Sequence, residues 1–219
     1  MPIKRTYAEL GDACFAARAL EVLGDRWSYP IMRELALGTK RFGELQRDVV
    51  GVTPAVLSTR LTELEGHGLI RRIVAHRSQS AVGYELTAAA LELQEVWFTL
   101  GRWGRRHLPD APDGAGLTPD AVVQAMLTVA DRRPLTPTVR LQLHLSDTRT
   151  DSSECDYVLH WDRDGLTIGR GTSADVEAVV HSDSSAWAGV VLGGLGIVDV
   201  SVDGDAEAVE RVAAAFADG

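Results

Sequence analysis

The sequence predicts two halves of different fold class, a mostly α N-terminal half and an α+β C-terminal half with an antiparallel sheet. Residues 1–108 carry 15 basic and 12 acidic residues, whereas residues 109–219 carry 7 and 19, so a net charge of +3 is followed by one of −12. Hydrophobic periodicity is helical up to about residue 131 and strand-like beyond it. We expect domains over 1–108 and 117–219, joined by a linker over 109–116 that is rich in proline, glycine and aspartate.

The N-terminal half begins with three predicted amphipathic helices, over residues 12–23, 27–37 and 42–49. Thr53-Pro54 then predicts the start of a fourth helix, because threonine is a good N-cap and proline is tolerated at the first helical position. In that helix Leu57, Leu61 and Leu64 share one face, so the opposite face is left to polar residues.

Two predicted strands, over residues 69–75 and 82–86, flank a basic and polar tip at 76–80. Helix, short turn, helix and hairpin in this order are typical of a winged helix-turn-helix, which places its second helix in the major groove of DNA. A long helix is predicted over 87–107, with more apolar surface than a small domain can bury. We therefore expect a homodimer.

Several motifs of this half resemble those of the HxlR-type (DUF24) bacterial transcriptional regulators. The resemblance covers roughly residues 10–108 and rests on the following segments: Cys14 with 19–27 and 31–35, then 40–45, 57–65, 68–72 and 84–87. It implies a winged helix-turn-helix that dimerises through its terminal helices.

Most candidate DNA contacts lie on the fourth helix and on the segments that flank it. Hydroxyl and guanidinium groups read base edges, and cations at a helix start or on a wing bind phosphate. The candidates are Thr39, Lys40, Arg41, Thr53, Pro54, Ala55, Ser58, Thr59, Arg60, His76 and Arg77.

The C-terminal half is predicted to be α+β. Helices are expected over 118–131, 187–192 and 205–216, and strands over 139–145, 156–162, 165–170 and 198–202. Asp164-Gly165 supplies the turn chemistry of a hairpin. Segments 165–168, 174–193 and 202–216 resemble the sterol-carrier-protein-2 (SCP2-like) fold.

That second resemblance implies a pocket for a small hydrophobic ligand. Its predicted lining residues are Leu143, Tyr157, Leu159, Trp161, Trp187, Val191 and Leu195. The same residues are also what an ordinary hydrophobic core of this size requires. Both interpretations remain open from the sequence.

The two cysteines, Cys14 and Cys155, lie in different halves, which is typical of a reducing cytosol. No apolar run approaches the roughly 20 residues that cross a bilayer, and the N-terminus lacks the apolar segment of a signal peptide. We expect a cytoplasmic protein without a membrane partner.

The sequence contains no nucleophile elbow or phosphate-binding loop, and its six histidines lack the spacing of metal ligands along the chain. It predicts no enzyme, cofactor or metal.

The sequence thus predicts a dimeric transcriptional regulator that binds double-stranded DNA at a near-palindromic operator and senses a small apolar ligand through its C-terminal domain. One alternative is a redox-responsive regulator that senses oxidants through Cys14, where the HxlR-type family often carries a cysteine. Another is a lipid-carrier or enzyme domain fused to a DNA-binding module.

Overall fold

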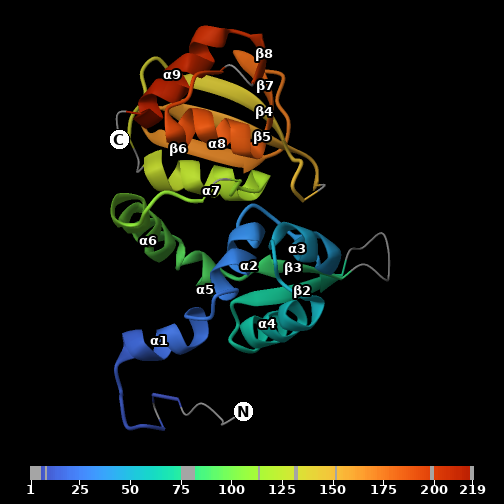
Figure 1. Ribbon diagram of the computed structural model, residues 1–219, viewed down its shortest axis with the longest axis vertical. Coiled ribbons are helices and arrows are strands. Elements are labelled where there is room, and N and C mark those ends of the chain that lie inside the picture. Colours follow the sequence, from blue (N-terminus) through green and yellow to red (C-terminus); the bar gives the residue numbers. More distant parts are fainter. Residues whose placement is uncertain are drawn as a thin grey trace. The chain divides into compact units, whose positions relative to one another are not determined.

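The computed structural model describes residues 6–7, 9–74, 82–112, 114–130, 133–150, 152–197 and 200–217. The chain forms two compact units, Met1–Glu92 and Leu93–Gly219 (Figure 1). This division falls before the expected linker at 109–116, because the helix over Gln94–His107 packs with the second unit. Across the described part of the chain, no helix is both long and apolar enough to cross a lipid bilayer.

The N-terminal unit has the predicted order of helix, turn, helix and hairpin. Its helices are α1 (Phe15–Leu23), α2 (Ser28–Leu35), α3 (Phe42–Asp48), α4 (Pro54–Gly66) and α5 (Ala88–Leu91). Its strands β1 (Lys40–Arg41), β2 (Ile70–Val74) and β3 (Val82–Leu86) form an antiparallel sheet in the order β1-β3-β2. Leu57, Leu61 and Leu64 of α4 are buried, as their spacing predicted.

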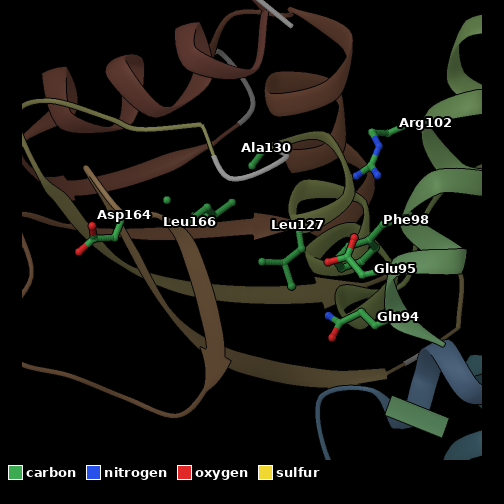
Figure 2. Close-up of a pocket in the computed structure, with 9 residues that line it drawn as sticks. Gln94, Glu95, Phe98, Arg102, Leu127, Ala130, Asp164 and Leu166 are labelled. Carbon is green, nitrogen blue, oxygen red and sulfur yellow. The ribbon is translucent and has the colours of Figure 1, made fainter. Parts of the chain in front are cut away.

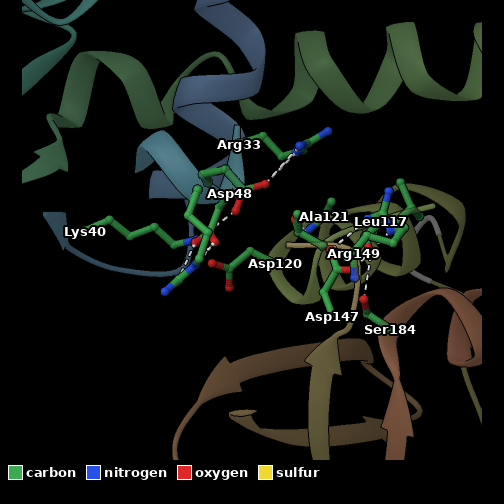
Figure 3. Close-up of polar contacts among 12 residues, drawn as sticks. Arg33, Lys40, Asp48, Leu117, Asp120, Ala121, Asp147, Arg149 and Ser184 are labelled. Carbon is green, nitrogen blue, oxygen red and sulfur yellow. Dashed lines mark hydrogen bonds and ion pairs between the residues drawn. The ribbon is translucent and has the colours of Figure 1, made fainter. Parts of the chain in front are cut away.

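A buried group of charged side chains links α2, β1 and α3. Lys40 Nζ lies 2.7 Å from Glu34 Oε2 and 2.7 Å from Asp48 Oδ2, and all three side chains are almost completely buried (Figure 3). Arg33 and Arg47 contact the outer oxygens of the same two carboxylates. Because charges in the interior require partners, this group fixes the relative placement of the three elements.

The electrostatic effect of the group is visible at Asp48. Burial alone would raise the pKa of this carboxyl, but the hydrogen bond from Arg47 and the charge of Lys40 outweigh it and lower the pKa below 3.8. Asp48 therefore remains ionised at neutral pH, as the pairing with Lys40 requires.

The helix predicted over 87–107 is two helices. Thr87 caps α5 as expected, since its hydroxyl accepts a hydrogen bond from the Ala90 N–H, but α5 ends at Leu91. After a turn, α6 (Gln94–His107) begins. The division between the two units falls at this same turn, so the two helices belong to different units.

The C-terminal unit is a five-stranded sheet with helices packed on it. The strands are β4 (Val139–Asp147), β5 (Ser152–Asp162), β6 (Gly165–Arg170), β7 (Ala178–Asp183) and β8 (Ser201–Gly204), in the order β6-β5-β4-β7-β8. The helices that accompany α6 are α7 (Pro119–Ala130), α8 (Ser184–Gly193) and α9 (Ala206–Ala217), and α7, α8 and α9 all contact β4. The predicted α+β class is confirmed.

The sheet is mixed, so the expectation of a purely antiparallel sheet is wrong. The β4–β5, β5–β6 and β7–β8 pairs are antiparallel, but β4 and β7 are parallel. After the hairpin, the chain returns past β4 and adds β7 on its other side (Figure 1). Short-range patterns predicted the hairpin, but the β4–β7 pairing joins segments that are far apart in sequence.

We expect replacement of Lys40 by Met to destabilise the N-terminal unit by about 3–5 kcal/mol, because it leaves the Glu34 and Asp48 carboxylates buried without their shared cation. Chemical denaturation measures the change. Arg71→Met is the matched control: Arg71 forms an exposed ion pair with Glu85, and its loss should cost less than about 1 kcal/mol. Equal losses for the two variants would contradict a structural role for Lys40.

Candidate nucleic-acid interface

The start of α4 is built as predicted. The Thr53 hydroxyl accepts a hydrogen bond from the Val56 N–H at 3.4 Å, and Pro54 occupies the first turn. Buried leucines hold the opposite face of the helix. The predicted readout residues at this end are exposed, namely Thr53, Pro54, Ala55, Ser58 and Thr59.

Two threonine hydroxyls on the exposed face of α4 donate to the backbone one turn earlier. Thr59 Oγ1 donates to the Ala55 carbonyl and Thr62 Oγ1 to the Ser58 carbonyl, both at 3.0 Å. A hydroxyl held in this way still accepts hydrogen bonds. These side chains therefore offer acceptors and methyl groups, which match the amino groups of adenine or cytosine and the methyl group of thymine.

One exposed residue of this surface was absent from the predicted set. Val56 lies in the first turn of α4 and is 36% exposed. Its position between Ala55 and Leu57 was visible in the sequence, but Val56 was not among the residues predicted to contact bases. An aliphatic side chain there can contact a thymine methyl group.

Arg60 is held by two carboxylates of its own unit. Its Nε lies 3.2 Å from Asp25 Oδ1, and its Nη1 contacts Glu63. The pair with Asp25 ties α4 to the segment before α2, and the pair with Glu63 lies within α4. A contact from Arg60 to DNA requires exchange of at least one of them for a phosphate or a guanine.

The three residues at the start of α3 differ in their access to solvent. Thr39 and Arg41 are exposed, whereas the Lys40 side chain is directed into the buried carboxylate pair. Alternation along β1 is the physical reason, since adjacent residues in a strand point to opposite faces. Lys40 is therefore removed from the surface available to phosphate, and it acts in the interior.

Of the wing, the structure describes only the strands β2 and β3. Predicted contacts His76 and Arg77 lie outside the described residues. On β2, Arg71 pairs with Glu85 of β3, and the Nε of Arg72 lies 3.0 Å from Glu65 of α4. Both arginine side chains are exposed, and each is paired with a carboxylate.

Cys14 is exposed at the N-cap of α1, where its N–H donates to Asp12 at 2.8 Å. Helix α1 has no buried residue, and its Phe15 is 85% exposed. The thiol is thus accessible on a helix whose apolar side chains lack cover within the described part of this unit.

Six of the seven predicted ligand-lining residues are buried in the C-terminal unit, and Leu195 is 66% exposed in the segment after α8. The hydroxyl of Tyr157 donates to Asp120 Oδ1 at 2.7 Å, and Arg170 binds the other carboxylate oxygen at 2.6 Å. Burial and the charge of Asp120 raise the pKa of Tyr157 far above its usual value. Tyr157 therefore holds α7 against the sheet as a neutral donor.

Trp187 differs from the other buried aromatic residues. Its side chain is fully buried, yet its indole Nε1–H has no hydrogen-bond partner among the described residues. By contrast, Trp161 Nε1–H donates to the Arg133 carbonyl at 2.7 Å. A buried donor of this kind calls for an acceptor, such as a water molecule or a ligand.

The C-terminal unit also has a cavity of about 210 Å³ between α6, α7 and the β5–β6 turn (Figure 2). Apolar side chains and polar side chains share its wall. The lining residues are Gln94, Glu95, Phe98, Arg102, Leu127, Ala130, Asp164, Gly165 and Leu166. None belongs to the set predicted from the sequence, and the space is smaller than typical pockets for drug-sized ligands, which hold about 300 Å³ or more.

Comparisons with known proteins concern the N-terminal part of the chain. The family model for an HxlR-like helix-turn-helix matches residues 22–112. The uncharacterized HTH-type transcriptional regulator Rv3095 of Mycobacterium tuberculosis is 38% identical over 97 residues, which cover 44% of this chain and 60% of that protein. YtcD of Bacillus subtilis, a regulator of the same description, is 37% identical over 89 residues, or 41% of this chain and 71% of YtcD.

Solved structures with similar sequences cover the same part. The reduced form of the transcriptional regulator YodB from B. subtilis is 28% identical. The match covers 46% of this chain and all of the YodB chain, with a TM-score of 0.42. The redox regulator HypR in its oxidized form is 30% identical. The match covers 45% of this chain and all of the HypR chain, with a TM-score of 0.41.

The capped helix α4, the preceding α3 and the β2–β3 hairpin define the N-terminal unit as a winged helix-turn-helix. The chain belongs to the family of HxlR-like helix-turn-helix proteins. It spans 60% of the length of the mycobacterial relatives.

Proposed function

We propose that the protein is a transcriptional regulator that binds double-stranded DNA through α4. The observation that carries this proposal is the first half of α4, where exposed hydroxyl, methyl and proline groups stand on a buried leucine face. A helix held this firmly presents a fixed pattern to the major groove. A dimer would read a near-palindromic operator with half-sites about 10 base pairs, or a multiple of that, apart.

Base contacts and phosphate contacts are assigned to different residues. Thr53, Ser58 and Thr59 carry the neutral groups that discriminate between bases, together with Pro54, Ala55 and Val56. Arg41 and Thr39 lie exposed at the start of α3, where a cation and a hydroxyl suit phosphate. The wing residues His76 and Arg77 stay in the proposal as further phosphate contacts.

We expect the two kinds of contact to respond differently to mutation. Arg41→Ala should weaken binding to all sequences and reduce the slope of log affinity against log salt by about 0.9 for each phosphate that the variant no longer neutralises. Ser58→Ala combined with Thr59→Val should lower discrimination between operator and altered operator by about 10-fold or more, since each mismatched pair costs about 1–3 kcal/mol. Fluorescence anisotropy with duplexes selected from a random pool measures both effects.

Arg163→Ala is the control for that experiment, because Arg163 is an exposed arginine in the hairpin turn of the C-terminal unit. It should leave affinity, discrimination and salt slope unchanged. If the α4 double variant selects the same sequences with the same affinity as the parent protein, α4 is not the reading element.

The proposed dimer rests on unpartnered apolar surface. On α6, one side packs against α7: Arg102 donates to the Thr128 carbonyl, and Gly101 lies against the Thr128 side chain. The other side carries Val96, Leu100 and Trp103, spaced at i, i+4 and i+7 and each about half exposed. Helix α1 exposes Phe15 and Leu20 as well. A second copy of the chain would cover such surfaces.

We expect Leu100→Glu to weaken the dimer by about 100-fold or more. Burying one leucine contributes about 1.5–3 kcal/mol, the twofold axis doubles the loss, and each 1.4 kcal/mol is tenfold in affinity. Light scattering during gel filtration measures the mass. Arg105→Glu is the matched control, because Arg105 is an exposed residue of α6 outside the group of Val96, Leu100 and Trp103. A dimer that survives Leu100→Glu unchanged would contradict this interface.

As the signal that changes DNA binding, we propose a small apolar ligand in the C-terminal unit, in keeping with the resemblance of its sequence to the SCP2-like fold. The fully buried Trp187 with its unpartnered indole N–H supports this, because a ligand with one acceptor group would satisfy it. The ligand must bind one dimer geometry better than the other in order to change DNA affinity. A redox signal at the exposed Cys14 is the second candidate, and a lipid-carrier or enzyme domain fused to the DNA-binding unit is the third.

The exposed position of Cys14 makes the redox candidate testable. If Cys14 is the sensor, a mild oxidant should change operator affinity of the parent protein and leave Cys14→Ser unaffected, because serine lacks the thiol that the oxidant converts to a sulfenic acid or a disulfide. Cys155→Ser serves as the control for the second thiol. An equal oxidant response in the parent protein and in Cys14→Ser would exclude sensing by Cys14.

A further inference from the structure

Two histidines and two carboxylates meet on the solvent-facing side of the C-terminal sheet. His144 lies on β4, His181 on β7, and Glu154 and Asp156 on β5. The three strands are neighbours in the order β5-β4-β7. In the strand register, His144 is paired with Asp156 on one side and with His181 on the other.

Strand alternation explains why these side chains share one face. Leu143 and Leu145 of β4, Tyr157 of β5 and Val180 of β7 are completely buried. The residues next to them therefore point to the opposite face. That face is free of α7, α8 and α9, which pack on the buried side of the sheet.

The distances within the cluster are short enough for a shared ion. His144 Nδ1 lies 2.7 Å from Asp156 Oδ1 and 3.7 Å from Glu154 Oε1, and His181 Nδ1 lies 4.0 Å from Glu154 Oε2. The two imidazole rings are stacked, with centroids 4.6 Å apart and 10° between their planes. One ligand atom each from His144, Glu154 and His181 falls within 4.8 Å of the others.

We propose that this cluster is a binding site for a divalent metal ion of zinc type. His144, His181 and Glu154 supply two nitrogen ligands and one oxygen ligand, and water completes a fourth position. Zinc binds histidine nitrogen at about 2.0–2.1 Å and carboxylate oxygen at about 2.0–2.2 Å, so its ligand atoms lie roughly 3.3–3.5 Å apart in a tetrahedron. Glu154 and His181 are exposed side chains that can rotate toward the ion.

The donor set decides the class of metal. Imidazole nitrogens with one carboxylate suit zinc and its neighbours in the transition series, whereas calcium and magnesium prefer oxygen ligands alone. Asp156 contacts the same Nδ1 atom of His144 that faces Glu154, so a metal ion on Nδ1 replaces this contact, and the negative charge of Asp156 stabilises the cation nearby.

The chain provides a matched control in His160 of β5. Its Nε2 lies 3.6 Å from Asp162 Oδ2, so it is also a partly exposed histidine beside a carboxylate. It belongs to the same sheet as His144, but no second histidine is paired with it in the strand register. His160→Gln therefore tests whether any histidine–carboxylate pair of this sheet binds zinc.

Isothermal titration of the untagged, chelator-treated full-length protein with zinc chloride at pH 7 tests the proposal. We expect one zinc ion per chain in the parent protein and in His160→Gln. His144→Gln and His181→Gln should each weaken binding by at least about 10–100-fold, the loss typical of removing even an outer-shell partner. Asp156→Asn should weaken it less than either histidine variant. Circular dichroism confirms that the variants fold.

Cobalt spectroscopy identifies the donors independently. A tetrahedral cobalt spectrum without a thiolate charge-transfer band supports the two-histidine site, and its loss in His181→Gln assigns it. A thiolate band would instead place the metal on Cys14 or Cys155 and overturn the proposal. Zinc binding that is absent from the parent protein, or unchanged in both histidine variants, would overturn it as well.

Discussion

The geometry of the N-terminal unit depends on the buried Lys40 ammonium between Glu34 and Asp48. These three residues come from β1, α2 and α3, so one interaction sets the position of the strand and of the two helices that come directly before α4. An isolated charge is energetically costly in a protein interior. Removal of any one of the three side chains would leave a buried charge without its partner. The helix-turn-helix is thus held by a specific ionic contact in addition to its leucine core.

Helix α4 combines this rigid support with a surface of neutral groups. Its threonine hydroxyls are already engaged with backbone carbonyls, and Arg60 is engaged with Asp25 and Glu63. The exposed surface therefore presents acceptors and methyl groups in fixed positions, while cations stand at its margins. Such a division suits a protein that finds DNA by charge and selects its sequence by shape and hydrogen bonding.

Much of the fold was predictable because it is encoded over short distances. The cap at Thr53, the leucine period of α4, the alternation from Val139 to Leu145 and the Asp164-Gly165 turn each involve residues within a few positions. The predictions failed where the structure depends on contacts between segments that are far apart in the sequence. The β4–β7 parallel pair made the sheet mixed, and the turn after Leu91 divided the expected long helix at the boundary between the two units.

The sequence by itself determined the winged helix-turn-helix, the α+β class of the second unit and the exposed face of α4, since period and capping act locally. Only the tertiary structure decided what the polar groups do. It turned Lys40 from a surface cation into an interior one, because β1 directs that side chain inward. It also brought His144 and His181 together, because strand pairing joins residues without any spacing rule along the chain.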